Sequence, residues 1–160
     1  CSNGKVIRKK PSGGYQLLDI DTPTRCVAQY DLDLKTAQLT NRRVILDCSK
    51  LSGFPDGMTA SADGRSIFIS FYNPDFAPYG ETRKFDLQSG EMLESYTTQD
   101  APQATCPQLC RLAGSVYLII TTAVEHMTQE RLEKSPASGS IFCAKTDYLE
   151  PADCPAFPVD

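Results

Sequence analysis

Hydrophobic and polar positions alternate in short runs along most of the chain, and stretches with the 3.6-residue period of a helix are rare. The runs are rich in Val, Ile, Phe, Tyr and Thr, and Gly, Pro, Asp and Asn separate them, which is typical of β-strands joined by turns. We therefore predict an all-β fold. Its expected strands lie at residues 15–20, 25–31, 43–47, 57–61, 66–72, 82–86, 91–97, 105–112, 115–122 and 140–144.

Three segments depart from this pattern. Residues 127–134 predict a short helix, because Thr128 can cap it and Glu130 stands four residues before Lys134. Residues 73–81 contain two Pro and one Gly and predict a long loop at an edge or rim of the fold. Residues 150–160 contain three Pro and predict a C-terminal tail rather than a domain.

A repeat of about 50 residues, the length of a propeller blade of four short strands, runs through the chain. Tyr30-Asp31-Leu32 recurs 55 residues later as Phe85-Asp86-Leu87, and Ile69 and Ile120 lie 51 residues apart in similar runs. The chain holds about three such units, whereas a closed ring needs about four to eight blades. We therefore expect Cys1 to lie within a blade, and the ring to be completed by a missing N-terminal half or by a second copy of the chain.

Composition narrows the classes of partner. The 160 residues include 16 Lys and Arg against 20 Asp and Glu, a formal net charge of −4, which disfavours a nucleic-acid partner. The longest apolar run, Val116 to Ala123, is far shorter than the roughly 20 residues of a membrane span, so we expect no membrane partner. A length of 160 residues would by itself suit one ordinary domain, but the repeat makes it about half of one.

The seven cysteines are spread along the chain without a disulfide-framework spacing. Cys106 and Cys110 have no second pair at zinc-ribbon spacing. The pattern favours free thiols in a reducing compartment, and we expect a cytoplasmic protein. A single disulfide involving Cys154 is the alternative, and an N-terminal nucleophile at Cys1 would require a maturation event.

The most informative stretch for chemistry is Phe54-Pro55-Asp56-Gly57-Met58-Thr59. Pro restricts the approach, Gly allows a sharp turn, and Asp56 stands at the head of a strand. The innermost strand of a propeller blade begins at the central channel, where this carboxylate could bind a hard cation or take a proton. The alternative is a carboxylate that only accepts hydrogen bonds from its own turn.

Several motifs together resemble the C-terminal half of the SMP-30/gluconolactonase family, also called regucalcin-like proteins. They occur in family order with near-family spacing, and the resemblance extends over most of the chain. The motifs are Ser2-Asn3-Gly4, Asp21 to Arg25, Asp31-Leu32-Asp33, Asn41-Arg42-Arg43, Pro55 to Thr59, Ala62-Asp63-Gly64, Phe71-Tyr72-Asn73, Thr105-Cys106, Thr121-Thr122-Ala123 and Ala137 to Phe142.

The resemblance implies a six-bladed β-propeller, of which this chain supplies about three blades, with one divalent cation in the channel. The family's ligands are a Glu from the first blade, an Asn before Gly, and the Asp of Pro-Asp-Gly. Asn3 and Asp56 match the last two, and the Glu would lie upstream of Cys1. Such an oxygen-rich site suits Ca²⁺ best, with Zn²⁺, Mn²⁺ or Mg²⁺ as alternatives.

The implied activity is metal-dependent hydrolysis of a small-molecule sugar lactone, with Asp56 as metal ligand and as the base that activates water. Residues 1–149 would form the C-terminal half of the propeller, and we expect the isolated 160-residue chain to be inactive. The alternative is a non-catalytic calcium-binding or interaction propeller of the same fold. A carbon–carbon ligase of the strictosidine-synthase kind shares the propeller but should lack this dense set of motifs.

Other polar residues are weaker candidates. His126, the single histidine, lacks a triad pattern around it, so we expect a structural or rim position rather than a substrate-facing one. Tyr72 and Asn73 end a predicted strand, and packing is favoured over a place at the pocket mouth. Asp31 and Asp33 are expected at a strand end and hairpin rather than in a second metal site.

Overall fold

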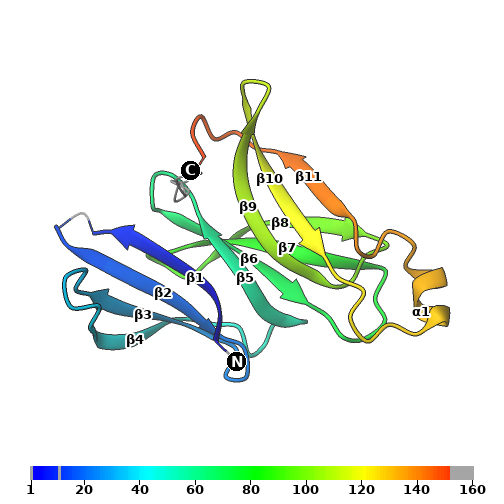
Figure 1. The fold of residues 1–160 in the computed structure, drawn as a ribbon, viewed down its shortest axis with the longest axis horizontal. Coiled ribbons are helices and arrows are strands. Elements are labelled where there is room, and N and C mark those ends of the chain that lie inside the picture. Colours follow the sequence, from blue (N-terminus) through cyan, green and yellow to red (C-terminus); the bar gives the residue numbers. More distant parts are fainter. Residues whose placement is uncertain (1, 11, 152–160) are drawn as a thin grey trace, which may run out of the picture.

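The computed structural model describes residues 2–10 and 12–151, and within them the chain forms eleven strands and one helix (Figure 1). The strands make three antiparallel sheets. In sequence order the first sheet contains β1 (Ser2–Lys9), β2 (Tyr15–Asp21), β3 (Cys26–Leu32) and β4 (Leu39–Asp47). The second contains β5 (Phe54–Ala60), β6 (Ser66–Tyr72), β7 (Tyr79–Asp86) and β8 (Met92–Gln99). The third contains β9 (Ala104–Leu112), β10 (Ser115–Thr122) and β11 (Ile141–Lys145), and α1 (Gln129–Lys134) lies between its last two strands.

The three sheets are the blades of a partial β-propeller, as the repeat predicts. Their first strands begin at residues 2, 54 and 104, which is the spacing of about 50 residues expected for blades. β5 packs against β1 on one side and against β9 on the other, so the three first strands form the innermost layer of the structure (Figure 1).

The strand boundaries differ from the prediction in four places. β1 was not expected, β4 begins at Leu39, β5 begins at Phe54, and β7 begins at Tyr79, which shortens the predicted loop to residues 73–78. The polar segments at these strand starts pair through backbone hydrogen bonds, which do not require alternating hydrophobic side chains. The helix begins at Gln129, and the Thr128 side chain accepts a hydrogen bond from the backbone N–H of Arg131, as an N-cap should.

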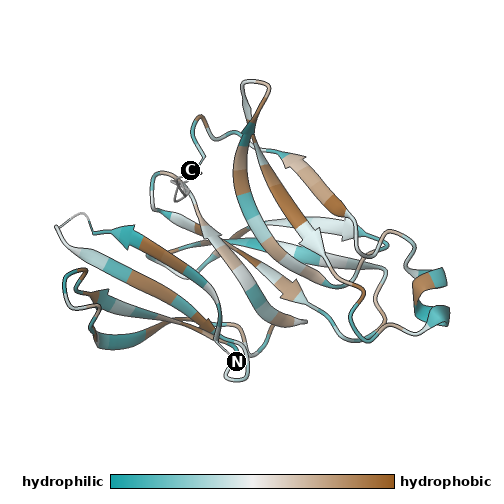
Figure 2. Cartoon of the chain, in the orientation of Figure 1, coloured by the Kyte–Doolittle hydropathy of each residue, from teal (hydrophilic) through white to brown (hydrophobic). Residues whose placement is uncertain are grey.

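The core consists of two hydrophobic layers, one on each side of the second blade. Figure 2 shows hydrophobic residues on strands of all three blades. Because side chains alternate along a strand, β6 sends Ile67 and Ile69 into the layer shared with the first blade and Phe68 into the layer shared with the third. Leu18 and Ile20 complete the first layer from β2. The second blade is therefore the centre of the packed structure.

Two further predictions concern the whole chain. No helix in residues 2–10 and 12–151 is long and apolar enough to cross a membrane.

The cysteines that the structure describes are free thiols, as expected, at positions 26, 48, 106, 110 and 143. Burial raises the pKa of Cys48 to about 12, so this thiol stays protonated and serves as a core side chain. Cys1, Cys154 and most of the predicted tail lie outside the described residues.

Candidate metal and catalytic site

Each inner strand contains a β-bulge near its start. The pairing register shifts between Ser2 and Lys5 in β1 and between Pro55 and Met58 in β5. A third shift lies where β9 pairs with Thr121 and Thr122. A bulge turns one side chain out of the regular alternation, and bulges are frequent beside active sites. The residues turned in this way in the first two blades belong to the Asn3-Gly4 and Asp56-Gly57 motifs.

The glycines of these motifs allow the inner strands to approach closely. A Cβ at Gly4 would lie 2.5 Å from the backbone N of Met58, and a Cβ at Gly57 would lie 2.5 Å from the carbonyl O of Thr105. Any larger residue at either position would force adjacent blades apart. The two glycines therefore explain how Asn3 and Asp56, which belong to different blades, come within contact distance.

The structure brings the two predicted ligands together, since the side chains of Asn3 and Asp56 share a hydrogen bond. Burial raises the pKa of Asp56 to about 6, the bond from Asn3 opposes that rise, and the negative charge of Glu125 adds to it. Asp56 is thus a desolvated carboxyl group whose charged form would gain from a bound cation.

The donor chemistry fits a hard divalent cation, because an amide oxygen and a carboxylate oxygen are the ligands that Ca²⁺ prefers. Within the part of the chain that the structure describes, no group of three or more His, Cys, Asp or Glu residues is placed to hold a metal. This chain therefore offers Asn3 and Asp56 as two ligands, and the rest of a coordination shell would have to be water or groups outside the described residues.

The segment that leads into Asp56 is held by the first blade. The Arg25 guanidinium donates to the carbonyl oxygens of Leu51 and Gly53 and stacks 4.9 Å from the centre of the Phe54 ring. The Thr22 hydroxyl donates to the carbonyl O of Pro55 at 2.9 Å. Both side chains lie in the Asp21 to Arg25 motif, to which sequence reasoning assigned no role.

The third blade contributes Cys106 and Thr105 next to Asp56. Desolvation and the charge of Asp56 raise the pKa of the Cys106 thiol, so it stays protonated. The Thr105 hydroxyl is hydrogen-bonded to the Thr121 hydroxyl, with 2.8 Å between the two oxygens. This wall of the site is therefore uncharged.

Tyr72 and Glu125 complete the rim of the site. Burial and the nearby Glu125 carboxylate raise the pKa of Tyr72, and the charge of Asp56 adds to this rise. The Tyr72 phenol is hydrogen-bonded to the Glu125 carboxylate, and packing as the main role of Tyr72 stays a prediction. Glu125 was missed because a lone Glu in an irregular segment gives no pattern to detect.

The other sequence candidates lie where predicted. His126 is at the rim, where 86% of its side chain is exposed and its Nε2 lies 3.5 Å from Glu125. Asp31 is the residue before the last of β3, and its carboxylate pairs with Lys10 at 2.9 Å. Asp33 accepts a hydrogen bond from the backbone N of Lys35 in the following turn.

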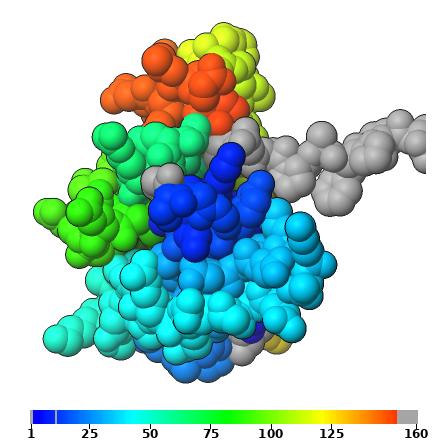
Figure 3. Space-filling view, turned by 90° about the vertical axis from the view of Figure 1, so that its left-hand side faces the viewer, coloured from blue at the N-terminus to red at the C-terminus, as the bar shows by residue number. Residues whose placement is uncertain are grey.

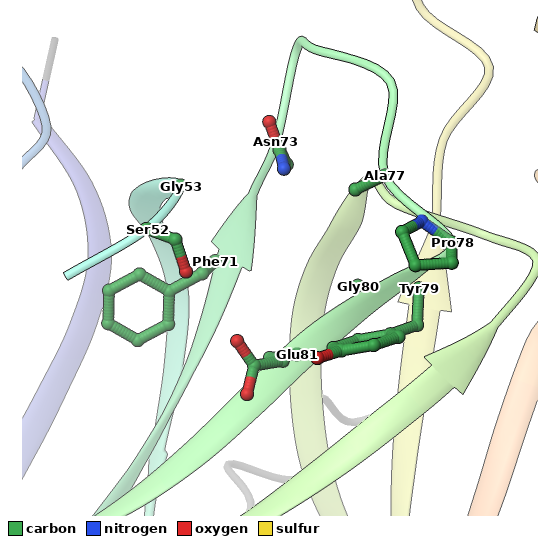
Figure 4. Close-up of a pocket in the computed structure, with 9 residues that line it drawn as sticks. All are labelled: Ser52, Gly53, Phe71, Asn73, Ala77, Pro78, Tyr79, Gly80 and Glu81. Carbon is green, nitrogen blue, oxygen red and sulfur yellow. The ribbon is translucent and has the colours of Figure 1, made fainter.

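A separate small pocket of about 180 Å³ opens between residues 52–53, the loop 73–78 and the start of β7 (Figure 4). Its charged group is Glu81, which pairs with the buried guanidinium of Arg83. Arg83 also donates to the Ser52 hydroxyl at 2.7 Å and lies 4.4 Å from the centre of the Phe71 ring. Since the charges there are already paired, we interpret this pocket as part of the packing of the second blade.

Comparison with known proteins points to one family. Residues 1–124 match the family model described as SMP-30/Gluconolactonase/LRE-like region. Over 125 residues the chain is 31% identical to regucalcin of Danio rerio and 30% identical to regucalcin of Homo sapiens. It is 26% identical over 130 residues to a Bacillus subtilis protein named "Putative sugar lactone lactonase YvrE".

These alignments cover 77% to 80% of this chain but only 38% to 41% of the relatives, so the chain spans less than half of their length. Among solved structures, a calcium-binding regucalcin from Agrobacterium tumefaciens superposes with a TM-score of 0.72 at 24% identity, over 94% of this chain and 48% of that one. A luciferin-regenerating enzyme superposes with a TM-score of 0.70 at 21% identity, over 91% of this chain and 45% of that one. Both likenesses support the propeller fold.

Proposed function

Since the chain belongs to the SMP-30/gluconolactonase/LRE-like family, we propose that it supplies one half of a metal-dependent sugar lactonase. The observation that carries the proposal is the contact between Asn3 and Asp56 at the bulges of two adjacent inner strands. It joins a neutral oxygen donor to a desolvated carboxylate at the end of the innermost layer. The Bacillus subtilis relative named as a putative sugar lactone lactonase supports this substrate class.

In this proposal residues 1–149 form the C-terminal half of a single six-bladed propeller. The other half comes from preceding polypeptide or from a second copy of the chain, and it completes both the ring and the ligand set. The 160-residue chain alone is inactive because two protein ligands hold a cation weakly. The free thiols support a reducing compartment, and we place the protein in the cytoplasm.

Asn3 Oδ1 and one Asp56 carboxylate oxygen would hold the cation, with Ca²⁺ favoured over Zn²⁺, Mn²⁺ and Mg²⁺. Once bound, such a cation supplies Lewis-acid polarisation of a lactone carbonyl. The second Asp56 oxygen is then available to take a proton from the attacking water. Burial favours this role, because a desolvated carboxylate is a stronger base than a solvated one. Asn3 orients the carboxylate, and the uncharged wall at Cys106 leaves Asp56 as the base on this side.

The test uses the chain completed to a full propeller and measures hydrolysis of gluconolactone with added Ca²⁺. We expect Asp56→Ala to lower kcat by about 10²- to 10⁴-fold, the usual contribution of a general base, and to weaken Ca²⁺ binding in calorimetry. Asn3→Ala should weaken Ca²⁺ binding with a smaller loss of kcat. The control is Asp31→Ala, whose carboxylate lies at the end of β3 and pairs with Lys10.

Two results would overturn the proposal. One is unchanged hydrolysis by Asp56→Ala in a folded protein. The other is tight Ca²⁺ binding by the unsubstituted protein without hydrolysis of any aldonolactone, which would instead support the non-catalytic calcium-binding propeller.

A further inference from the structure

We propose that Arg8 and Arg43 form a binding site for a phosphate group on the first blade, at the end of β1 that is remote from Asn3. Arg8 lies five residues along β1 from Asn3, or about 17 Å at the usual rise of a strand. The site is therefore separate from the candidate metal site, and the inference does not depend on the proposed lactonase activity.

A row of four polar side chains, one from each strand of the first blade, positions the two arginines. Arg8 in β1 donates from Nε and Nη2 to the amide oxygen of Gln16 in β2, at 3.2 and 3.1 Å. With its amide oxygen turned toward the surrounding donors, Gln29 in β3 accepts from Gln16 Nε2 at 2.7 Å. The same oxygen accepts from Nε and Nη2 of Arg43 in β4, at 3.0 and 2.8 Å. Two amides therefore link the two guanidinium groups.

The burial of the two glutamines makes this row rigid. Gln16 is 7% exposed and Gln29 is 5% exposed, so neither amide can exchange its partners freely for water. Arg8 is also tied to the second blade, because its Nη1 donates to the carbonyl O of Gly64, in the turn between β5 and β6, at 2.6 Å. A ligand of the two arginines would therefore lose little affinity to the ordering of their side chains.

Neither guanidinium forms an ion pair with a carboxylate within the part of the chain that the structure describes. The Asp31 carboxylate lies within the field of Arg43. It already accepts hydrogen bonds from Lys10 Nζ and from the Asn41 amide, each at 2.9 Å. Burial and the positive charge of Arg43 lower the pKa of Arg8. An anion that contacts both arginines would offset this repulsion between like charges.

The donors that remain suit a phosphate group. Gln29 uses Nε and Nη2 of Arg43, whereas Nη1 of Arg43 has no hydrogen-bond partner among the described residues, and the Arg43 side chain is exposed. A planar guanidinium presents its N–H groups in a fork that matches two oxygens of one phosphate. A phosphate group has enough oxygens to accept from Arg8 and Arg43 together.

The charge of the first blade also favours an anion. Residues 2–47 contain eight Lys and Arg against five Asp and no Glu, although the whole chain has a formal net charge of −4. The excess of positive charge is therefore confined to this blade. Anions are attracted to such a region before they make any specific contact.

The experiment titrates inorganic phosphate into the completed propeller without Ca²⁺, in about 0.1 M NaCl, which screens charges more than about 10 Å away. Calorimetry gives the dissociation constant, and thermal unfolding gives the melting temperature with and without phosphate. The matched control is Arg42→Gln, which removes the same charge one residue from Arg43. Arg42 Nε donates to the Tyr30 hydroxyl at 3.1 Å, on the other face of the sheet.

We expect Arg43→Gln and Arg8→Gln each to weaken phosphate binding by about 10-fold or more, because each removes charge-assisted hydrogen bonds. Arg42→Gln should weaken it by less than about 2-fold. Arg43→Lys should give an intermediate loss, since it keeps the charge without the planar fork. Phosphate should raise the melting temperature of the unsubstituted protein and of Arg42→Gln but not of Arg43→Gln, a difference that does not depend on the stability of each variant without phosphate.

Three results would overturn the site. They are no saturable phosphate binding by the unsubstituted protein, equal losses in Arg42→Gln and Arg43→Gln, which would assign the binding to the general charge of the blade, and unchanged binding in Arg8→Gln. Methyl phosphate distinguishes the source of the ligand: binding as tight as that of phosphate supports a site for phosphate esters, and weaker binding supports a site for the free ion. Hydrolysis of gluconolactone is not part of either readout, so failure of the site leaves the lactonase proposal standing.

Discussion

The first and second blades have the same order of four antiparallel strands, yet their side chains meet different surroundings. Counted from Asn3 and Asp56, Ile7 in β1 occupies the position of Ala60 in β5. Ile7 is 60% exposed, whereas Ala60 is 6% exposed and packs in the layer between the two blades. Figure 3 views the molecule from the side of the first blade, whose strands form much of the visible surface. The burial of a blade's side chains therefore depends on the blades beside it rather than on the blade's own pattern of hydrophobic and polar residues.

The same contrast explains why the site forms where it does. β5 has an inner strand on each side, β1 and β9, and Asp56 is the ligand candidate that lies between them. Asn3 lies in β1, and the inner strand that packs against β1 within the described residues is β5. The central blade is thus the part of this chain in which a complete set of packing contacts and a desolvated carboxylate coincide.

The largest effect is expected from removing the same side chain in the two blades. Ile67 is 1% exposed in β6, and Ile67→Ala should lower the free energy of unfolding by about 2–5 kcal/mol because it leaves a cavity. Ile7→Ala should change it by less than about 0.5 kcal/mol, since Ile7 already meets solvent. Urea denaturation of the chain measures both. Equal losses would show that the two blades are equally packed and would remove the basis of the comparison.

A smaller effect is expected at the glycines between the inner strands. Gly57→Ala would press a methyl group against the backbone of Thr105, and Gly4→Ala would press one against Met58. Each should cost about 1–3 kcal/mol, the usual range for overpacking. If both interfaces are built alike, the two losses agree. A loss at Gly57 alone would mean that β1 can move away from β5, and thermal unfolding monitored by circular dichroism distinguishes the two results.

The smallest effect concerns pH. Asp56 has a pKa of about 6 in the folded chain and an ordinary value of 3.8, so the folded state binds more protons between these two pH values. Without added cation, the melting temperature should therefore fall as pH rises from about 4 to about 6 and then level off. Asp56→Asn should flatten this dependence. A decline of the same size in Asp56→Asn would assign it to other groups.

Much of the architecture was predictable because it is local. The ten expected strands exist, and the 50-residue repeat identified the blades, since hydrophobic alternation and turn residues are properties of neighbouring positions. β1 was missed because its segment Ser2 to Lys9 is largely polar and pairs mainly through its backbone with β2. The start of β5 was placed three residues too late, because Phe54-Pro55-Asp56 resembles a turn until the bulge is seen.

The candidate site, like the fold, can be divided into features predicted from the sequence and features seen only in the tertiary structure. The sequence by itself determined the blade repeat and the family, and it predicted Asn3 and Asp56 as a ligand pair, because each depends on short motifs at a set spacing. Only the tertiary structure decided that Gly4 and Gly57 bring that pair together, and that Tyr72 meets Glu125. Those contacts join residues from different blades. The free energy of these contacts depends on how closely the strands pack and on how completely water is excluded from the contacts. Neither quantity can be derived from the spacing of residues along the chain.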